Sequence, residues 1–158
     1  MLNQKDLQIL SQLRQNSRQT LTTMSKHTRI PISTIYDRLK FHEGGIIKRF
    51  TSLIDFSSLG YTTRVNLLIK VPREQRERLK VYLMGHQNVN CVFKINNEFD
   101  FMVEAIFKNI KQAESFKEAI EQGFRVDSLN IFYVTEDLKR EGFLSDPQLL
   151  PHMHLVSQ

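Results

Sequence analysis

The spacing of hydrophobic residues along the chain changes near residue 61. Before that point apolar residues recur every three or four positions, as at Leu7 and Leu10, which is typical of amphipathic helices. From Tyr61 to about Thr135 apolar and polar residues alternate over several short stretches, which is typical of β-strands. This change predicts two domains of different construction.

The first 50 residues are predicted to form three helices and a strand. Asn3 and Thr20 can cap the first and second helices, because their side-chain oxygens can accept a backbone N–H of the first turn. Gly44-Gly45 ends the third helix, and residues 46–54 are expected to form a strand. This order is that of a winged-type helix-turn-helix domain.

The third helix has one apolar and one polar face. Ile35 and Leu39 are four residues apart, so they point to the same side, toward the core. His42 also falls on the inward side, where we expect a buried structural histidine. The outward face holds hydroxyl, aromatic and charged side chains, from Ser33, Thr34, Tyr36, Asp37 and Lys40. Such a face suits a DNA major groove, although an ordinary solvated helical corner would show the same spacing.

Charge favours the DNA-binding interpretation of this domain. Residues 1–50 contain nine Lys and Arg residues and three acidic residues, a net charge of +6. The whole chain carries +5, so the remaining residues carry −1. The basic excess is therefore confined to the helical third, which indicates a polyanionic partner unless the asymmetry arose by chance.

The expected DNA contacts come from the third helix and the segments on either side of it. We expect groove contacts from Ser33, Thr34, Tyr36 and Lys40. We expect phosphate contacts from Arg29, Arg38, Lys48 and Arg49. Arg38 has an alternative role as a structural arginine that ties the helices together.

Beyond residue 60 the predicted elements follow the order β-α-β-β-α-β, the ferredoxin-like plait. The fold class is therefore α+β, with a winged-type helix-turn-helix domain followed by a ferredoxin-like domain. The predicted boundaries are residues 1–50 for DNA binding, 51–60 for a strand and hinge linker, 61–135 for the ferredoxin-like domain, and 136–158 for a C-terminal tail.

The helices of such a plait cover only one face of its sheet. The opposite positions are expected to hold Leu68, Val92, Met102 and Ile106. An uncovered face with this content would be an exposed apolar patch, so we expect a second subunit's sheet to cover it. Scattered surface apolar residues are the alternative.

Other features of the sequence narrow the class of protein. The single Cys91 excludes an intramolecular disulfide, and no apolar run reaches membrane-spanning length. No nucleophile, metal-ligand or phosphate-loop motif is found, so neither catalysis nor a metal or other cofactor is predicted. A cytoplasmic, nucleoid-associated location is expected.

Several segments, taken in order, resemble the Lrp/AsnC (leucine-responsive, "feast/famine") transcription regulators over roughly residues 2–135. The resemblance rests on residues 2–6 with Ile9, Leu10 and Leu13, on Asn16-Ser17-Arg18, on Ser33-Thr34-Ile35 with Arg38, on Gly45-Ile46-Ile47, on residues 55–60, and on Asn97-Glu98-Phe99-Asp100. Asn97 stands where the family has a glycine, and asparagine tolerates the left-handed conformation that such a turn needs.

The resemblance implies a regulator that binds double-stranded DNA as a homodimer and often assembles further, to octamers in many members. It also implies that residues 61–135 are a RAM-type dimerisation and effector domain, with a small effector, commonly an amino acid, near Asn97, Glu98 and Asp100. Asp100 could accept a hydrogen bond from an ammonium group, or it could merely cap the hairpin turn.

Two other functions are compatible with a similar fold. A chromatin-architectural protein would cover DNA with little sequence preference. A haem-pathway decarboxylase-like enzyme would carry clustered His and Arg around the plait, whereas this plait contains only His86.

Overall fold

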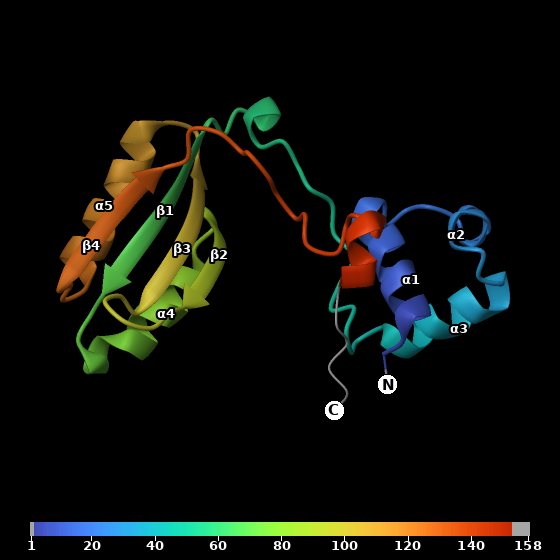
Figure 1. Ribbon diagram of the computed structural model, residues 1–158. Coiled ribbons are helices and arrows are strands. Elements are labelled where there is room, and N and C mark those ends of the chain that lie inside the picture. The colour runs from blue at the N-terminus through green and yellow to red at the C-terminus, as the bar shows by residue number, and fades with distance from the viewer. Residues whose placement is uncertain (1, 153–158) are drawn as a thin grey trace. The chain divides into compact units, whose positions relative to one another are not determined.

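The computed structural model describes residues 2–152 of the chain. The contacts among these residues divide them into two compact units (Figure 1). The first unit comprises residues 2–53 together with residues 138–152, and the second comprises residues 54–137. No helix in this part of the chain is both long and apolar enough to cross a bilayer.

Three helices build the N-terminal part of the first unit: α1 (Gln4–Gln15), α2 (Leu21–Thr28) and α3 (Ile32–His42). The predicted caps of α1 and α2 are confirmed, because Asn3 shares a reciprocal capping box with Asp6, and the Thr20 side chain accepts the N–H of Thr23. The helices close on one core of buried apolar residues, formed by Ile9, Met24, Ile30 and Ile35.

The strand expected at residues 46–54 is not formed. Gly44, with φ of +74°, turns the chain after α3, and the Ile47 N–H donates to the His42 carbonyl at 3.0 Å. A single bridge joins Glu43 and Ile47. Within residues 2–152 no backbone hydrogen bond involves residues 48–55. The apolar residues at positions 46–54 could not make a strand on their own, because a strand needs a neighbour for its N–H and C=O groups.

The second unit has the predicted β-α-β-β-α-β order. Its elements are β1 (Thr63–Lys70), α4 (Arg76–Gly85), β2 (Val89–Lys94), β3 (Phe101–Phe107), α5 (Ile110–Gly123) and β4 (Ser128–Tyr133), with short 3-10 turns at Ser57–Leu59 and Arg73–Gln75. The strands lie in the order β2-β3-β1-β4, and every neighbouring pair is antiparallel. The ferredoxin-like fold is therefore confirmed.

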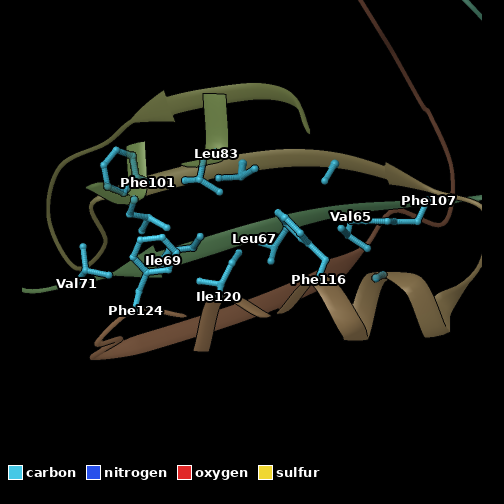
Figure 2. Close-up of a cluster of buried hydrophobic side chains, with 14 residues drawn as sticks. Val65, Leu67, Ile69, Val71, Leu83, Phe101, Phe107, Phe116, Ile120 and Phe124 are labelled. Atoms are coloured by element: carbon cyan, nitrogen blue, oxygen red, sulfur yellow. The ribbon is translucent and has the colours of Figure 1, made fainter. Parts of the chain in front are cut away.

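The core of this unit lies between the sheet and its two helices. Figure 2 shows Val65, Leu67 and Ile69 of β1 pointing toward the layer that holds Phe116 and Ile120 of α5. Leu79 and Leu83 of α4 and alternate residues of β3 complete the same cluster. Because these side chains occupy every second strand position, the intervening positions form the opposite, open face of the sheet.

A β-bulge in β2 corrects one prediction about that open face. The pairing of β2 with β3 shifts register between Val89 and Cys91, so one residue more lies on β2 than on β3. Val92 then pairs with core-facing Val103 and packs on the core, so its expected place on the open face is wrong. Phe93 takes that place instead, opposite Met102 and 49% exposed.

The segment after β4 returns to the first unit. Its 3-10 helix η3 (Pro147–His152) packs beside α1 (Figure 1). Leu150 is only 3% exposed, so this contact has a buried apolar centre. The predicted C-terminal tail, residues 136–158, thus packs in part on the helix-turn-helix unit, which was not predicted from the sequence.

Candidate nucleic-acid interface

The core of the first unit fixes the direction in which α3 presents its side chains. Ile35 is fully buried and His42 is 3% exposed, so these residues mark the inward side of the helix. Ser33, Tyr36 and Lys40 are exposed on the other side, and Tyr36 retains 54% of its surface. Thr34 is half-buried at the edge of this outward face.

Three expected phosphate-binding residues lie at the two ends of α3 and are exposed. Arg29 ends α2 in the left-handed conformation, with φ of 59°, and so turns the chain into α3. Lys48 and Arg49 follow the Gly44 turn. Within residues 2–152, the side chains of these three residues and of Ser33, Thr34, Tyr36 and Lys40 make no hydrogen bond or ion pair. They are therefore available to a ligand.

Arg38 differs from the other expected contacts because it is directed at a buried carboxylate. Its Nε lies 3.5 Å from Oδ1 of Asp6, which is completely buried. The same oxygen accepts a hydrogen bond from Nε2 of His42 at 3.0 Å, and Oδ2 accepts the Asn3 N–H at 2.8 Å. This geometry corresponds to the structural role for Arg38, and it confirms His42 as a buried structural residue.

The pKa of Asp6 reflects this environment. Burial by itself raises the pKa, but the hydrogen bonds from His42 and Asn3 and the charge of Arg38 outweigh it, so the pKa lies below its ordinary value. The carboxylate is therefore ionised at neutral pH and ties the start of α1 to the end of α3. The contact holds the outward face of α3 in one orientation within the unit.

Arg14 connects the tail to α1, a contact that sequence reasoning missed. Its guanidinium donates to the carbonyls of Phe143 at 3.0 Å and Glu141 at 2.8 Å, and pairs with the Glu141 carboxylate at 2.8 Å. Gln15 donates to the Ser145 carbonyl at 2.8 Å. A cavity of about 830 Å³ lies between α1, residues 46–53 and this tail segment.

In the second unit, the hairpin expected to bind an effector is held by its own contacts. Asn97 adopts φ of 73°, the left-handed conformation expected for this turn. The Asp100 carboxylate accepts the Val71 N–H at 3.0 Å and pairs with Arg76 at 2.8 Å. Both carboxylate oxygens are engaged, so the geometry favours the turn-holding role of Asp100. Glu98 is exposed.

A cavity of about 470 Å³ lies at the other end of the plait, at the start of α5. Its wall includes Tyr61, Tyr82, His86, Lys108 and Phe116. The Nδ1 of His86 accepts the Asn88 N–H at 3.2 Å, and burial lowers the pKa of the imidazole. No prediction included this cavity, because its wall comes from three separate segments of the sequence, at residue 61, residues 82–88 and residues 107–119.

The open face of the sheet carries a row of apolar side chains across three strands. Phe93, Met102 and Leu68 lie side by side in the strand register. Phe132 of β4 is 52% exposed on the same face. Ile106, also expected there, is only 7% exposed, and it lines a cavity together with Phe56 and Leu59.

Comparison with known proteins agrees with this architecture. The model of the winged helix-turn-helix DNA-binding family matches residues 2–48. An uncharacterized HTH-type transcriptional regulator of Pyrococcus abyssi is 28% identical over 148 residues, which cover 93% of this chain and 100% of that protein. The HTH-type transcriptional regulator FL11 of Pyrococcus horikoshii is 29% identical over 120 residues, which cover 75% of this chain and 80% of FL11.

Solved structures share the fold of both units. A transcriptional regulator from Neisseria meningitidis, in complex with L-Met, has a TM-score of 0.81 at 21% identity, covering 89% of this chain and 94% of that one. Bacillus subtilis LrpC has a TM-score of 0.78 at 20% identity, covering 88% and 98%. Escherichia coli AsnC has a TM-score of 0.76 at 16% identity, covering 89% and 96%.

The chain is thus a two-unit protein with a winged-type helix-turn-helix and a ferredoxin-like plait. Solved structures with this arrangement include proteins named as transcriptional regulators, from Neisseria meningitidis and Agrobacterium tumefaciens. The resemblance to the Lrp/AsnC regulators is confirmed.

Proposed function

We propose that this protein is a sequence-specific, DNA-binding transcription regulator that acts in the cytoplasm on nucleoid DNA and is not an enzyme. The observation that carries the proposal is the outward face of α3. The hydroxyl, phenol and ammonium groups of Ser33, Tyr36 and Lys40 are exposed there and have no hydrogen-bond or ion-pair partner within residues 2–152. Such groups can hydrogen-bond to base edges, and Arg29, Lys48 and Arg49 lie where phosphates would flank the groove.

The same observation favours a regulator over a chromatin-architectural protein. A protein that recognises only the DNA backbone and the shape of the duplex needs cations, but it needs no exposed helix face that contacts base edges. Here the cations surround such a face. The net charge of +6 in residues 1–50 would supply the salt-dependent part of the affinity, and α3 would supply the sequence preference.

We further propose that the protein acts as a homodimer, or a higher oligomer, formed through the open sheet face. Leu68, Met102 and Phe93 form a continuous apolar row that the chain's own helices do not cover. Two recognition helices related by twofold symmetry would then read a pseudo-palindromic site.

We also propose that a small effector binds to the second unit. A structural relative from Neisseria meningitidis was solved with L-Met, which favours an amino acid. In this chain the Asp100 carboxylate is occupied by Val71 and Arg76, so an ammonium group would have to displace Arg76. The cavity beside His86 is a second place where a small molecule would fit.

In vitro selection from a random duplex library tests the proposed function. We expect purified full-length protein to enrich one pseudo-palindromic site with half-sites a whole number of helical turns apart. Footprinting at several salt concentrations should then show a sharp boundary at that site. Uniform protection of every duplex, with no enriched sequence, would favour the architectural alternative.

A further inference from the structure

Asp37 lies in the centre of the outward face of α3. It follows the buried Ile35 by two residues, about 200° around the helix, so it points away from the core. Ser33, one turn earlier, and Lys40, three residues later, flank it on the exposed side. Any ligand that contacts Ser33 and Lys40 together must also meet the Asp37 carboxylate.

The position of this acid is unusual within its unit. The other two acids of residues 1–50 are Asp6, which is buried against His42, and Glu43, which is exposed just beyond the end of α3. Lys40 stands at i+3 from Asp37, a spacing that brings Lys80 and Glu77 of α4 to 3.2 Å. No such pair forms between Asp37 and Lys40, and within the described residues the Asp37 carboxylate has no hydrogen-bond or ion-pair partner.

A carboxylate at this point opposes DNA binding unless it makes a contact of its own. DNA phosphates repel it, and it cancels part of the attraction of the neighbouring cations. A carboxylate is an acceptor only, so it can gain affinity solely from a donor on a base edge. In the major groove cytosine presents a donor, its N4 amino group, whereas adenine places an acceptor, N7, beside its donor.

We infer that Asp37 determines sequence specificity by accepting a hydrogen bond from the N4 amino group of a cytosine in each half-site. This inference rests on the proposed function. The negative charge of Asp37 would weaken binding to every duplex. The hydrogen bond would offset this loss of affinity only where a cytosine lies opposite Asp37. It would thus act mainly by rejecting wrong sequences.

Selection and binding experiments on three variants test this role. Asp37→Asn and Asp37→Ala both remove the charge at the centre of the face, and Glu43→Gln removes the same charge beside it. All three should bind random duplex somewhat more tightly than the wild type. Only the Asp37 variants should lose preference for one C·G pair per half-site, by about fivefold or more, the lower range of one base contact. Asp37→Asn should shift that preference toward adenine, which an amide can read at N6 and N7.

A substituted duplex identifies the atom that is read. The cytosine at the affected position is replaced by 2-pyrimidinone deoxynucleotide, which lacks the N4 amino group. Wild type and Glu43→Gln should lose about fivefold or more in affinity, whereas Asp37→Ala should lose almost none. Equal losses in all three proteins, or an Asp37→Ala variant that selects the wild-type site unchanged, would overturn the inference and leave the proposed function standing. A wild type that enriches no site would instead overturn the proposed function, and this inference with it.

Discussion

Replacing Asp6 by Asn should loosen the helix-turn-helix unit without unfolding the plait. The carboxylate accepts hydrogen bonds from His42 Nε2 at 3.0 Å and from the Asn3 N–H at 2.8 Å, and lies 3.5 Å from Arg38 Nε. A hydrogen bond to a charged group contributes about 1.5–3 kcal/mol, and the partly exposed Arg38 adds at most about 1 kcal/mol. Because the Asn amide keeps one acceptor oxygen, we expect a net loss of about 2–4 kcal/mol.

Native-state hydrogen exchange measures this loss unit by unit. A loss of about 2 kcal/mol lowers protection roughly 30-fold, which we expect at Ile9 of α1 and Ile35 of α3. Leu67 and Val103 in the plait core serve as the internal control and should keep their protection. Glu43→Gln, which removes an exposed acid from the same unit, should change neither set. Unchanged protection of Ile9 and Ile35 in Asp6→Asn would refute the assigned role.

The same carboxylate predicts a pH dependence. Its pKa in the folded state is lowered, because the hydrogen bonds from His42 and Asn3 and the charge of Arg38 outweigh the effect of burial. Its contribution to stability is therefore complete above the ordinary value of 3.8 and is lost as the pH falls through the lowered pKa. As the pH falls below 3.8, the wild-type unit should lose stability more steeply than Asp6→Asn. Parallel curves would show that another group carries the acid sensitivity.

Three further predictions concern assembly, the tail and the effector. Met102→Lys should convert the dimer into monomers, as measured by light scattering at micromolar concentration. The control Val81→Lys, at an exposed position of α4, should leave the dimer intact. A monomeric wild type would contradict the proposed interface. Arg14→Met removes the contacts to Glu141 and Phe143. Trypsin should therefore cut this variant after Lys139 or Arg140 several-fold faster than it cuts the control Arg18→Met. Equal cleavage rates would show that Arg14 does not hold the tail. One of the twenty amino acids at millimolar concentration should raise the melting temperature, since a ligand at about 100 times its dissociation constant stabilises a fold by roughly 2.7 kcal/mol. A shift that is kept in Asp100→Asn but lost in His86→Ala would place the binding site in the cavity beside His86. If no amino acid shifts the melting temperature, an amino-acid effector is excluded.

Local chemistry made most elements predictable from the sequence. Asn3 and Thr20 cap their helices with the expected side-chain bonds, because capping depends only on residues three positions apart. The alternation of Val65, Leu67 and Ile69 identified the core face of β1, because successive side chains of a strand point to opposite faces of the sheet. The buried position of His42 followed from its spacing to Ile35.

The errors and omissions arise where distant residues decide the outcome. The bulge at residues 89–91 depends on how β2 meets β3, and it exchanged the faces of Val92 and Phe93. Within residues 2–152, the segment 46–54 forms only the bridge between Ile47 and Glu43, so the expected strand has no neighbouring strand to pair with. The contacts of Arg14 span more than 120 positions to the tail. The engagement of Asp100 by Val71 and Arg76 likewise requires the folded hairpin.

The specificity ratio of α3 variants tests the central claim most directly. The affinity for the selected site is divided by the affinity for a scrambled duplex of equal length, at several salt concentrations. We predict that Lys40→Ala lowers this ratio by the equivalent of about 1–3 kcal/mol, whereas Lys48→Ala weakens both duplexes alike and reduces the salt slope by about one. A wild-type ratio near one, or a ratio that Lys40→Ala leaves unchanged while Lys48→Ala lowers it, would contradict the account of α3 as the sequence-reading element.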